Sequence, residues 1–323
     1  MAVLSQNAKL TIIEAIKAQG YDDFAAVVGD LAQLQDFLDE AVWLPTTHGS
    51  FNKAFQAKSL GKGGFSKANS AVPVIASSGD DVVEPVKLYE GDSVIDERVL
   101  KGTIDPYKVR DSQDAMNLEG CTQDWLYNLI TASGGPDGFK GFMARRPALD
   151  KKTCFGFGGT ASGSLSSGYM IEFGPSGFYL GYNPVEGVVP GFSNEDRGRH
   201  SVPAPDGNGN MWAWIRHYEI WGALIERNKR ALIRLANINP AGGTGDFSSA
   251  PFLAAKRWQP SGGRRSVAFF SRNVAARIDE FCYSKSNAAY GLRDIQGYGP
   301  VSMVGGVPIR VIDAIPETET TVS

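Results

Sequence analysis

The sequence contains few of the residues that build metal centres or disulfide frameworks. Its 323 residues include only three histidines and three cysteines, which are His48, His200, His217, Cys121, Cys154 and Cys282. The cysteines lie far apart and form no C-x-x-C pair, so the sequence predicts reduced thiols in a cytosolic setting. The histidines never fall at i, i+4 spacing and have no cysteine beside them, so neither a metal site nor a cofactor is predicted.

Long apolar runs and a strong charge of one sign are also missing. No apolar run approaches the roughly 18–20 residues that a membrane span needs. Charged residues interrupt the apolar stretch of residues 1–20, and no N-x-S/T sequon occurs, so we expect neither a membrane span nor a secretory signal. The formal net charge is −3, which disfavours a conventional sequence-specific DNA-binding protein.

The composition is nevertheless that of a folded protein. Hydrophobic residues make up 42% of the chain and aromatic residues 11%, which excludes wholesale disorder. The 38 glycines and 17 prolines exceed average usage and predict many turns or long loops. A chain of 323 residues can form one large core or two small ones.

Two short helices are predicted at the start of the chain. Apolar residues recur at helical spacing over residues 8–19, and the pattern stops at Gly20. A second apolar stripe begins near Asp22, and Pro45 ends it because proline disfavours helix at the preceding residue.

The following segment, residues 46–92, is rich in Gly, Ser, Lys and Asn. It has too few apolar residues to hold a core of its own. This composition predicts an extended arm with two strands, Ala71–Ala76 and Val82–Leu88. The arm needs a neighbour to bury its apolar side chains.

The longest helical pattern covers residues 105–132. Pro106 suits its first turn, and Gly134 lies where the pattern ends. Gly120 lies in the middle, where glycine costs about 1 kcal/mol relative to alanine and permits a slight bend.

The remainder of the chain favours strands, because β-branched and aromatic residues are enriched in short runs. These runs are Tyr169–Phe173, Phe178–Tyr182, Met211–Trp221, Val267–Phe270 and Val307–Ile315. A helix is predicted from about Asn273 to Cys282. The fold class is therefore α+β with a projecting arm.

Two motifs offer enzymatic alternatives, but their contexts argue against both. GFGGTA at 156–161 fits the G-x-G-x-x-A dinucleotide fingerprint, yet the sequence after it is a poor helix start. SLSSG at 164–168 is one glycine short of the elbow that would expose Ser166 as a nucleophile, and it leads into a strand. A Gly-rich loop and a Ser-rich turn are favoured, while a nucleotide-binding enzyme and a serine hydrolase stay as alternatives.

Charged residues form small groups along the chain. Asp80-Asp81 and the carboxylates of residues 92–97 are typical of solvated side chains. His217 lies among aromatic residues, where a structural role is the simplest interpretation. Basic residues could contact phosphates locally, although pairs on a chain of net charge −3 are typical of an ordinary surface. They are Arg145-Arg146, Lys151-Lys152, Arg264-Arg265, Arg227, Lys229, Arg230 and Arg234.

The order of these segments resembles that of the major capsid proteins of tailed double-stranded DNA phages, and the podophage type in particular. The resemblance covers nearly the whole chain. It rests on VWLP at 42–45, SLGKGGFSKANSAVPV at 59–74, VIDERVLKG at 94–102, SSGYMIEFGPSGFYLGYNPVEG at 166–187, WIRHYEIWGALIERNKRALIRLANI at 214–238, FCYSKSNAAYGL at 281–292 and GGVPIRVIDAI at 305–315.

The resemblance implies the coat fold that tailed phages share with herpesvirus shells. Its expected parts are an N-terminal arm with two helices (1–45), an extended loop (46–97), a peripheral domain with a spine helix (98–165), and an axial domain (166–323) whose strands return to the peripheral domain. No crosslinking Lys–Asn pair is identified, so covalent linkage between subunits is not part of this expectation.

The resemblance also implies a function, which is self-assembly into hexamers and pentamers that form an icosahedral shell around packaged phage DNA. Scaffolding, portal and decoration proteins are the further partners it implies, with assembly in the host cytoplasm and no enzymatic activity. We expect the apolar side chains of the arm to contact neighbouring subunits. These candidate contacts are Phe51, Phe55, Phe65, Val72 and Val74. An encapsulin-type compartment shell is a further alternative.

Overall fold

The computed structural model describes residues 36–101, 106–135, 138–184, 191–204, 209–284, 289–295 and 299–323. The chain divides into two compact units, each assembled from stretches that are distant in sequence. The described residues of the first unit come from Leu88–Tyr127 and Gly191–Ile220, and the second unit contains the rest. The helix predicted at 8–19 and most of the second predicted helix lie outside the described residues.

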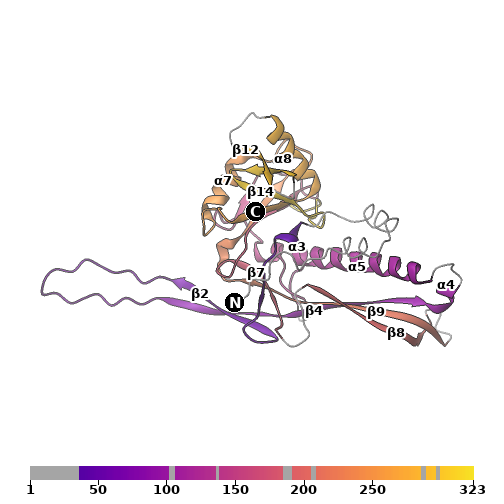
Figure 1. Ribbon diagram of the computed structural model, residues 1–323. Helices are drawn as coiled ribbons and strands as arrows, with labels where there is room; N and C mark the ends of the chain where they lie inside the picture. Colours follow the sequence, from indigo (N-terminus) through magenta and orange to yellow (C-terminus); the bar gives the residue numbers. More distant parts are fainter. Residues whose placement is uncertain are drawn as a thin grey trace. The chain divides into compact units, whose positions relative to one another are not determined.

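Strands and a long helix make up the first unit (Figure 1). In chain order the elements are β4 (Lys87–Asp96), α4 (Glu97–Lys101), α5 (Pro106–Thr131), β8 (Phe192–Pro203) and β9 (Asn210–Glu226). β8 and β9 pair antiparallel, with Phe192 opposite Ile220 and Pro203 opposite Asn210. β4 is a further neighbour of β9 in the sheet order.

Aromatic and polar contacts hold α5 against the strands of this unit. The Trp125 indole is buried, and it meets the Phe192 ring edge to face with 6.2 Å between the centroids. On β9, the Tyr218 hydroxyl donates to the backbone oxygen of Asp114 at 2.8 Å. The helix predicted at 105–132 is confirmed, because α5 runs over Pro106–Thr131.

A seven-stranded mixed sheet forms the centre of the second unit, with strand order β12-β13-β14-β11-β6-β10-β5. Its members are β5 (Cys154–Gly156), β6 (Ser166–Glu172), β10 (Leu232–Ile238), β11 (Ser266–Phe270), β12 (Tyr290–Ile295), β13 (Gly299–Val304) and β14 (Val307–Val311). β10 and β11 flank β6 and both run antiparallel to it. All residues of β6 are buried, which fits a central strand.

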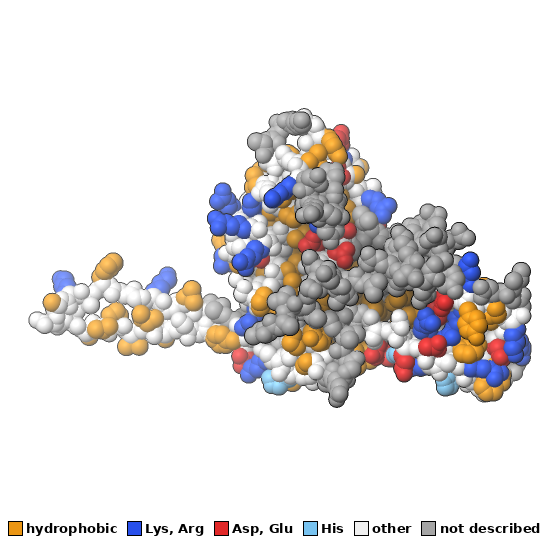
Figure 2. Space-filling model, in the orientation of Figure 1, with side chains coloured by type: hydrophobic (Ala, Val, Ile, Leu, Met, Phe, Trp, Pro, Cys, Tyr) orange, Lys and Arg blue, Asp and Glu red, His pale blue; other side chains and the backbone are white. Residues whose placement is uncertain are grey.

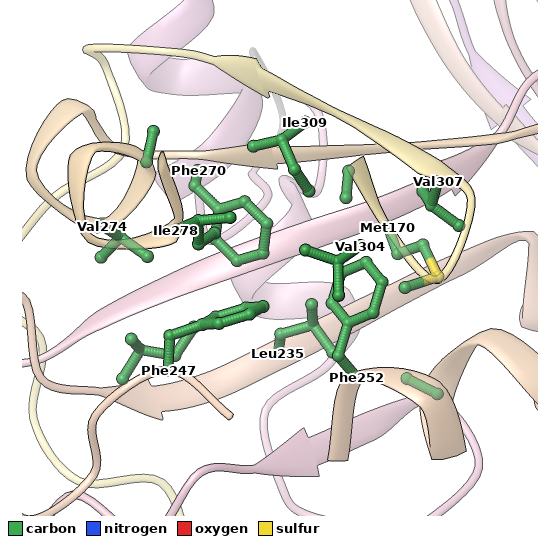
Figure 3. Close-up of a cluster of buried hydrophobic side chains, with 14 of the residues drawn as sticks. Met170, Leu235, Phe247, Phe252, Phe270, Val274, Ile278, Val304, Val307 and Ile309 are labelled. Atoms are coloured by element: carbon green, nitrogen blue, oxygen red, sulfur yellow. The ribbon is translucent and has the colours of Figure 1, made fainter. Parts of the chain in front are cut away.

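Two helices, α7 (Ser249–Trp258) and α8 (Arg272–Ser284), supply apolar side chains to the core of this sheet. Figure 3 shows Phe252 of α7 and Ile278 of α8 directed toward the same cluster as Met170 and Phe270 of the strands. These four side chains are fully buried. Each contributes roughly 1.5–3 kcal/mol relative to an exposed position, so this cluster is a main source of stability.

The rest of the second unit consists of shorter elements and a two-stranded arm. They are α3 (Phe37–Glu40), β1 (Trp43–Pro45), β2 (Phe51–Ser59), β3 (Ser78–Pro85), α6 (Phe142–Arg145), β7 (Phe178–Tyr182) and the 3₁₀ turn η2 (Lys229–Ala231). β1 pairs parallel with β7, and β7 pairs antiparallel with the last residues of β9. β2 pairs antiparallel with β3.

The prediction that the second helix continues to Pro45 is wrong. The helix ends at Glu40, because Ala41 adopts an extended conformation and Trp43–Pro45 pair with β7. The Phe37 side chain is fully buried against Phe142 and Phe269. Tertiary packing and strand pairing therefore override the helical spacing of the apolar residues.

The prediction of the arm strands is also partly wrong. Residues 71–77 have no regular secondary structure, and the strand that pairs with β3 is β2, at Phe51–Ser59. The strand predicted at Val82–Leu88 corresponds to the end of β3 and the start of β4, which Val86 separates. β2 is rich in Asn, Lys and Gln, so its composition alone does not indicate a strand.

Candidate assembly surface

The arm, residues 46–87, is attached to the second unit at its base by buried side chains. Asn52 and Ala54, on alternate positions of β2, are 1% and 5% exposed. The Asn52 side-chain oxygen accepts a hydrogen bond from the Thr47 backbone at 3.2 Å. Val86, after β3, packs against the buried cluster that contains Tyr179 and Ile225. The base of the arm is therefore part of a packed core.

The outer part of the arm carries apolar side chains that are exposed. Phe65 and Val74 are fully or almost fully exposed, at 113% and 95% of the reference area. Leu60, Val72, Phe55 and Ile75 are 77%, 80%, 64% and 59% exposed. Figure 2 shows hydrophobic side chains distributed along this ribbon. Exposed apolar side chains concentrated on one segment are typical of an interaction site.

Four of the five predicted contact residues lie in this exposed region, namely Phe55, Phe65, Val72 and Val74. Phe51 differs, because it is partly buried and its ring stacks on His48 with 4.6 Å between the centroids. Leu60 and Ile75 were not among the predicted contacts. They share the chemistry of the other four, and their place in the same Gly-rich segment was the available signal.

The two antiparallel segments of the arm approach each other closely at Gly61. A Cβ at this position would lie 2.3 Å from Ile75 Cγ2 and 2.8 Å from the Ala76 backbone oxygen. The Gly61 amide donates to Ser77 Oγ at 3.0 Å, which holds the two segments together. Only glycine fits there without displacing backbone, so Gly61 fixes the spacing of the arm.

A buried cluster of charges, the arm clamp, connects β3 to the body of the second unit. It consists of Glu84, Arg145, Arg146 and Glu226. Arg145 binds Glu84 through both guanidinium nitrogens, with Nη1 2.9 Å from Oε1 and Nη2 3.1 Å from Oε2. Its Nη1 also lies 3.6 Å from Glu226 Oε2. Arg146 pairs with Glu226 and donates to the backbone oxygens of Leu232 and Lys229.

Three of the four side chains of the arm clamp are almost completely shielded from water, and the fourth, Glu84, is 20% exposed. The side chains of Arg145, Arg146 and Glu226 are 6%, 7% and 7% exposed. Burial raises the pKa of Glu226, and the guanidinium groups of Arg146 and Arg145 act in the opposite direction. The interpretation of Arg145-Arg146 as an ordinary surface pair is therefore wrong. Both arginines are structural, because each neutralises a buried carboxylate.

His217 lies in the first unit beside carboxylates rather than only among aromatic rings. Its Nδ1 is 2.7 Å from Asp92 Oδ1, and its Nε2 is 3.8 Å from Glu90 Oε2 and from Glu219 Oε2. The side chain is 9% exposed. These contacts fit the structural role predicted for His217. They also show that Asp92 is paired and not simply solvated.

The two enzyme-like motifs have geometries that do not suit catalysis. Ser166 lies within β6, is fully buried, and has Oγ 3.4 Å from Ser271 Oγ, whereas a nucleophile elbow would expose it. GFGGTA begins at the end of β5, and the next regular element is the strand β6. The amides of Phe157 and Gly159 in this segment donate to Ala236 and Asn237 backbone oxygens. The Gly-rich segment is a loop that is hydrogen-bonded to β10.

Cys154 and Cys282 are buried free thiols, and Cys121 is half-buried. Burial raises the pKa of Cys154 to about 11, so this thiol stays protonated at neutral pH. Within the described ranges, no group of three or more His, Cys, Asp or Glu side chains is placed to hold a metal ion. No described helix is long and apolar enough to cross a membrane.

Comparisons with known proteins identify the fold and the family. The sequence matches the family described as major capsid protein GP7 over residues 19–323. A search of curated proteins gives no match. The structure is similar to a chain in the near-atomic structure of bacteriophage Epsilon15, with a TM-score of 0.66, 20% identity, and coverage of 90% of each chain. The shared fold is that of tailed-phage capsid proteins.

Two further structures show lower similarity. The bacteriophage JBD30 capsid has a TM-score of 0.48 and 10% identity, with 87% of this chain and 91% of that chain covered. The encapsulin of Synechococcus elongatus PCC 7942 has a TM-score of 0.44 and 9% identity, with 66% and 95% covered. The family match spans nearly the whole chain, and the predicted resemblance to phage coat proteins is confirmed. The chain belongs to the major capsid protein GP7 family and is a structural component of a phage capsid shell.

Proposed function

We propose that the chain assembles into hexamers and pentamers that close an icosahedral shell around packaged double-stranded DNA. The observation that carries this proposal is the arm, whose outer part exposes Phe65, Val74 and four further large apolar side chains. A single subunit leaves these side chains in water. Identical subunits in a closed lattice each supply an arm and a surface that receives it, so the contact repeats over the whole shell.

The residues proposed to make this contact are Phe55, Phe65, Val72 and Val74, with Leu60 and Ile75 added to the predicted set. Burial of each side chain contributes roughly 1.5–3 kcal/mol, so several per subunit are enough to hold a lattice. Phe51 is proposed to act at the base, because it already stacks on His48. The arm clamp holds this base in place through Arg145 and Glu84.

The proposal includes functional parts and partners. The four segments predicted from the sequence, with boundaries at 45, 97 and 165, are proposed as an N-terminal arm, an extended loop that includes residues 46–87, a peripheral domain and an axial domain. Scaffolding, portal and decoration proteins are proposed as partners, with assembly in the host cytoplasm. The mechanism is assembly and rigid-body rearrangement, without catalytic turnover. The buried position of Ser166 supports a role without hydrolase chemistry.

Electron microscopy and light scattering of the purified chain test the proposal. We expect particles or capsomers for the unmodified chain, and loss of both for the double substitution Phe65→Ser with Val74→Ser. The control is Val99→Ser on α4, because Val99 is also an exposed apolar side chain, at 59%, and lies outside the arm. A chain that stays monomeric at high concentration, with or without a scaffolding partner, contradicts the proposal.

A further inference from the structure

Six cationic side chains converge at one end of the seven-stranded sheet. We call this surface the basic edge. Its members are Arg227, Lys229, Arg230, Arg257, Arg264 and Arg265, and all six are exposed. They come from three segments: the end of β9 with η2, the end of α7, and the loop before β11. The sequence shows them only as separate pairs, and the fold brings them together.

The topology of the sheet explains the convergence. β10 begins at Leu232, opposite Ile171 of β6, and β11 begins at Ser266, opposite Glu172 of β6. Since both strands run antiparallel to β6, the segments that lead into them reach the carboxyl end of β6. Neighbouring strands are about 4.8 Å apart, so the segments ending at residues 231 and 265 enter the sheet about 10 Å apart.

Hydrogen bonds fix the backbone of all three segments at this end. Arg227 donates from its amide to Gly177 O at 3.0 Å and from Nη1 to Pro175 O at 3.2 Å, in the loop after β6. Gln259, next after α7, donates from Nε2 to Met170 O at 2.9 Å. Ser261 donates from both its amide and Oγ to Glu172 Oε2, at 3.0 and 2.9 Å.

These bonds position the cations without neutralising them. Glu172, the carboxylate at this end of β6, is 9% exposed and receives its hydrogen bonds from Ser261. None of the six side chains forms an ion pair with any residue in the described ranges, whereas Arg145 and Arg234 of the same unit pair with the buried carboxylates of Glu226 and Glu319. Figure 2 shows Lys and Arg side chains gathered where Figure 1 places α7.

The geometry points to a polyanion, and we infer that the basic edge binds the phosphate backbone of double-stranded DNA. This inference rests on the proposed function, in which the chain encloses DNA. Five of the six cations are arginine, whose planar fork matches two phosphate oxygens. A protein interface would place apolar anchors at its centre and would deplete lysine. The sequence neighbours of these cations are mostly small or polar, such as Asn228, Ser261 and Gly262, and Trp258, the large apolar one, is 38% exposed.

A contact of this kind does not recognise the base sequence of the DNA. The cations come from loops and from the ends of β9 and α7, and not from one helix or strand that could lie in a groove, so the contact is with phosphates and is independent of sequence. The local charge also explains how a chain of net charge −3 can hold DNA, because the basic edge concentrates positive charge that the rest of the molecule balances.

The test is DNA binding by the purified full chain, measured by fluorescence anisotropy with a labelled 30-base-pair duplex of arbitrary sequence at several NaCl concentrations. The variants are Arg264→Gln with Arg265→Gln, and Lys229→Gln with Arg230→Gln. The matched control is Lys151→Gln with Lys152→Gln, which removes the same charge from an exposed pair of the second unit. Polyglutamate is the competing probe for an acidic protein partner.

We expect each basic-edge variant to bind about tenfold more weakly, and the slope of log affinity against log salt to decrease by roughly one to two. The control variant should bind as the unmodified chain does. The inference is overturned by equal binding of all variants, by absence of DNA binding in the unmodified chain, or by tighter binding of polyglutamate than of DNA. Particle formation is scored separately, so a chain that binds DNA through this edge without assembling contradicts only the proposed function.

Discussion

Arg145 forms a two-pronged ion pair with Glu84, with Nη1 to Oε1 at 2.9 Å and Nη2 to Oε2 at 3.1 Å. The pair joins the arm strand β3 to α6, and the Arg145 side chain is 6% exposed. Because Arg145 also faces Glu226, it links the arm to the end of β9. The arm is therefore anchored at its base by a charge contact in which the Arg145 side chain is almost fully buried.

Glu84→Gln should loosen the arm without unfolding the second unit. The substitution removes a charge-assisted bidentate pair, and we expect a loss of about 1–3 kcal/mol in the free energy of unfolding. Lys53→Gln is the control on the same hairpin, because the Lys53–Asp81 pair has both side chains about half exposed. It should change stability by less than about 1 kcal/mol. Urea denaturation of both variants checks this, and equal effects would show that the clamp has no special role.

Glu319→Gln should destabilise the second unit, because Glu319 contacts the neighbouring strands β6 and β10 of the seven-stranded sheet. Glu319 is buried, pairs with Arg234 at 2.7 Å, and accepts from Ser167 Oγ at 2.6 Å. Breaking a buried pair costs about 3–5 kcal/mol, because Arg234 is left without its counter-charge. Glu317→Gln is the control, since its carboxylate contacts Asn273 at a more exposed position. Thermal unfolding that shows the same midpoint for both variants would contradict this account.

Asp150 should make stability depend on pH at the acidic end. Burial raises its pKa, but hydrogen bonds from the Thr153 side chain and from the Thr153, Lys152 and Cys154 amides prevail and lower the pKa to about 2. The Asp150 carboxylate therefore binds a proton more weakly in the folded state than in the unfolded chain. Its stabilisation is fully present above about pH 4 and is lost as pH falls toward 2.

Asp150→Asn should therefore destabilise the protein at pH 7 by about 1 kcal/mol, a value reduced for the solvent exposure of this side chain. The difference between the variant and the unmodified chain should shrink between pH 4 and pH 2. Chemical denaturation at a series of pH values measures it. A difference that is constant across this range would show that the Asp150 charge does not contribute.

Gly120 and Gly61 can be compared directly, because the space around a new Cβ is open at Gly120 and filled at Gly61. A Cβ at Gly120 would have no atom within 4 Å apart from the adjacent residues and the nearby backbone of α5, whereas one at Gly61 would meet Ile75 and Ala76. Gly120→Ala should stabilise the protein by about 0.5–1 kcal/mol, because alanine favours helix and restricts the unfolded chain. Gly61→Ala should separate the two segments of the arm, and we therefore expect proteases to cleave the arm faster. Destabilisation by Gly120→Ala would indicate that a bend at this position is required.

Local patterns were sufficient to predict the elements whose own composition strongly favours a strand or a helix. The strand expected at Phe178–Tyr182 has those bounds in the structure, and α5 differs from its prediction by one residue at each end. Trp43–Pro45 was missed as a strand because its partner β7 is more than a hundred residues away in sequence. No local pattern encodes such a pairing, and the apolar spacing before Pro45 suggested a helix instead.

The same distinction holds for the candidate surface. The exposure of Phe65 and Val74 could be predicted, because a Gly-rich segment has nothing local to cover them. The burial of Arg145 and Arg146 could not, because Glu226 lies 80 residues beyond Arg146. The basic edge likewise depends on the order of β10, β6 and β11, which only the fold provides.

Trypsin protection of the arm tests the central claim most directly. Lys62 and Lys67 are exposed within the outer arm, so trypsin should cut after both in free subunits. In assembled shells the neighbouring subunit should cover this segment, and the two cuts should become slower by at least tenfold relative to cleavage at an exposed lysine elsewhere, such as Lys151. Mass spectrometry of the fragments gives both rates in one experiment. Slower cleavage at Lys62 and Lys67 in shells supports the arm as a lattice contact, and equal cleavage in the two states would contradict it.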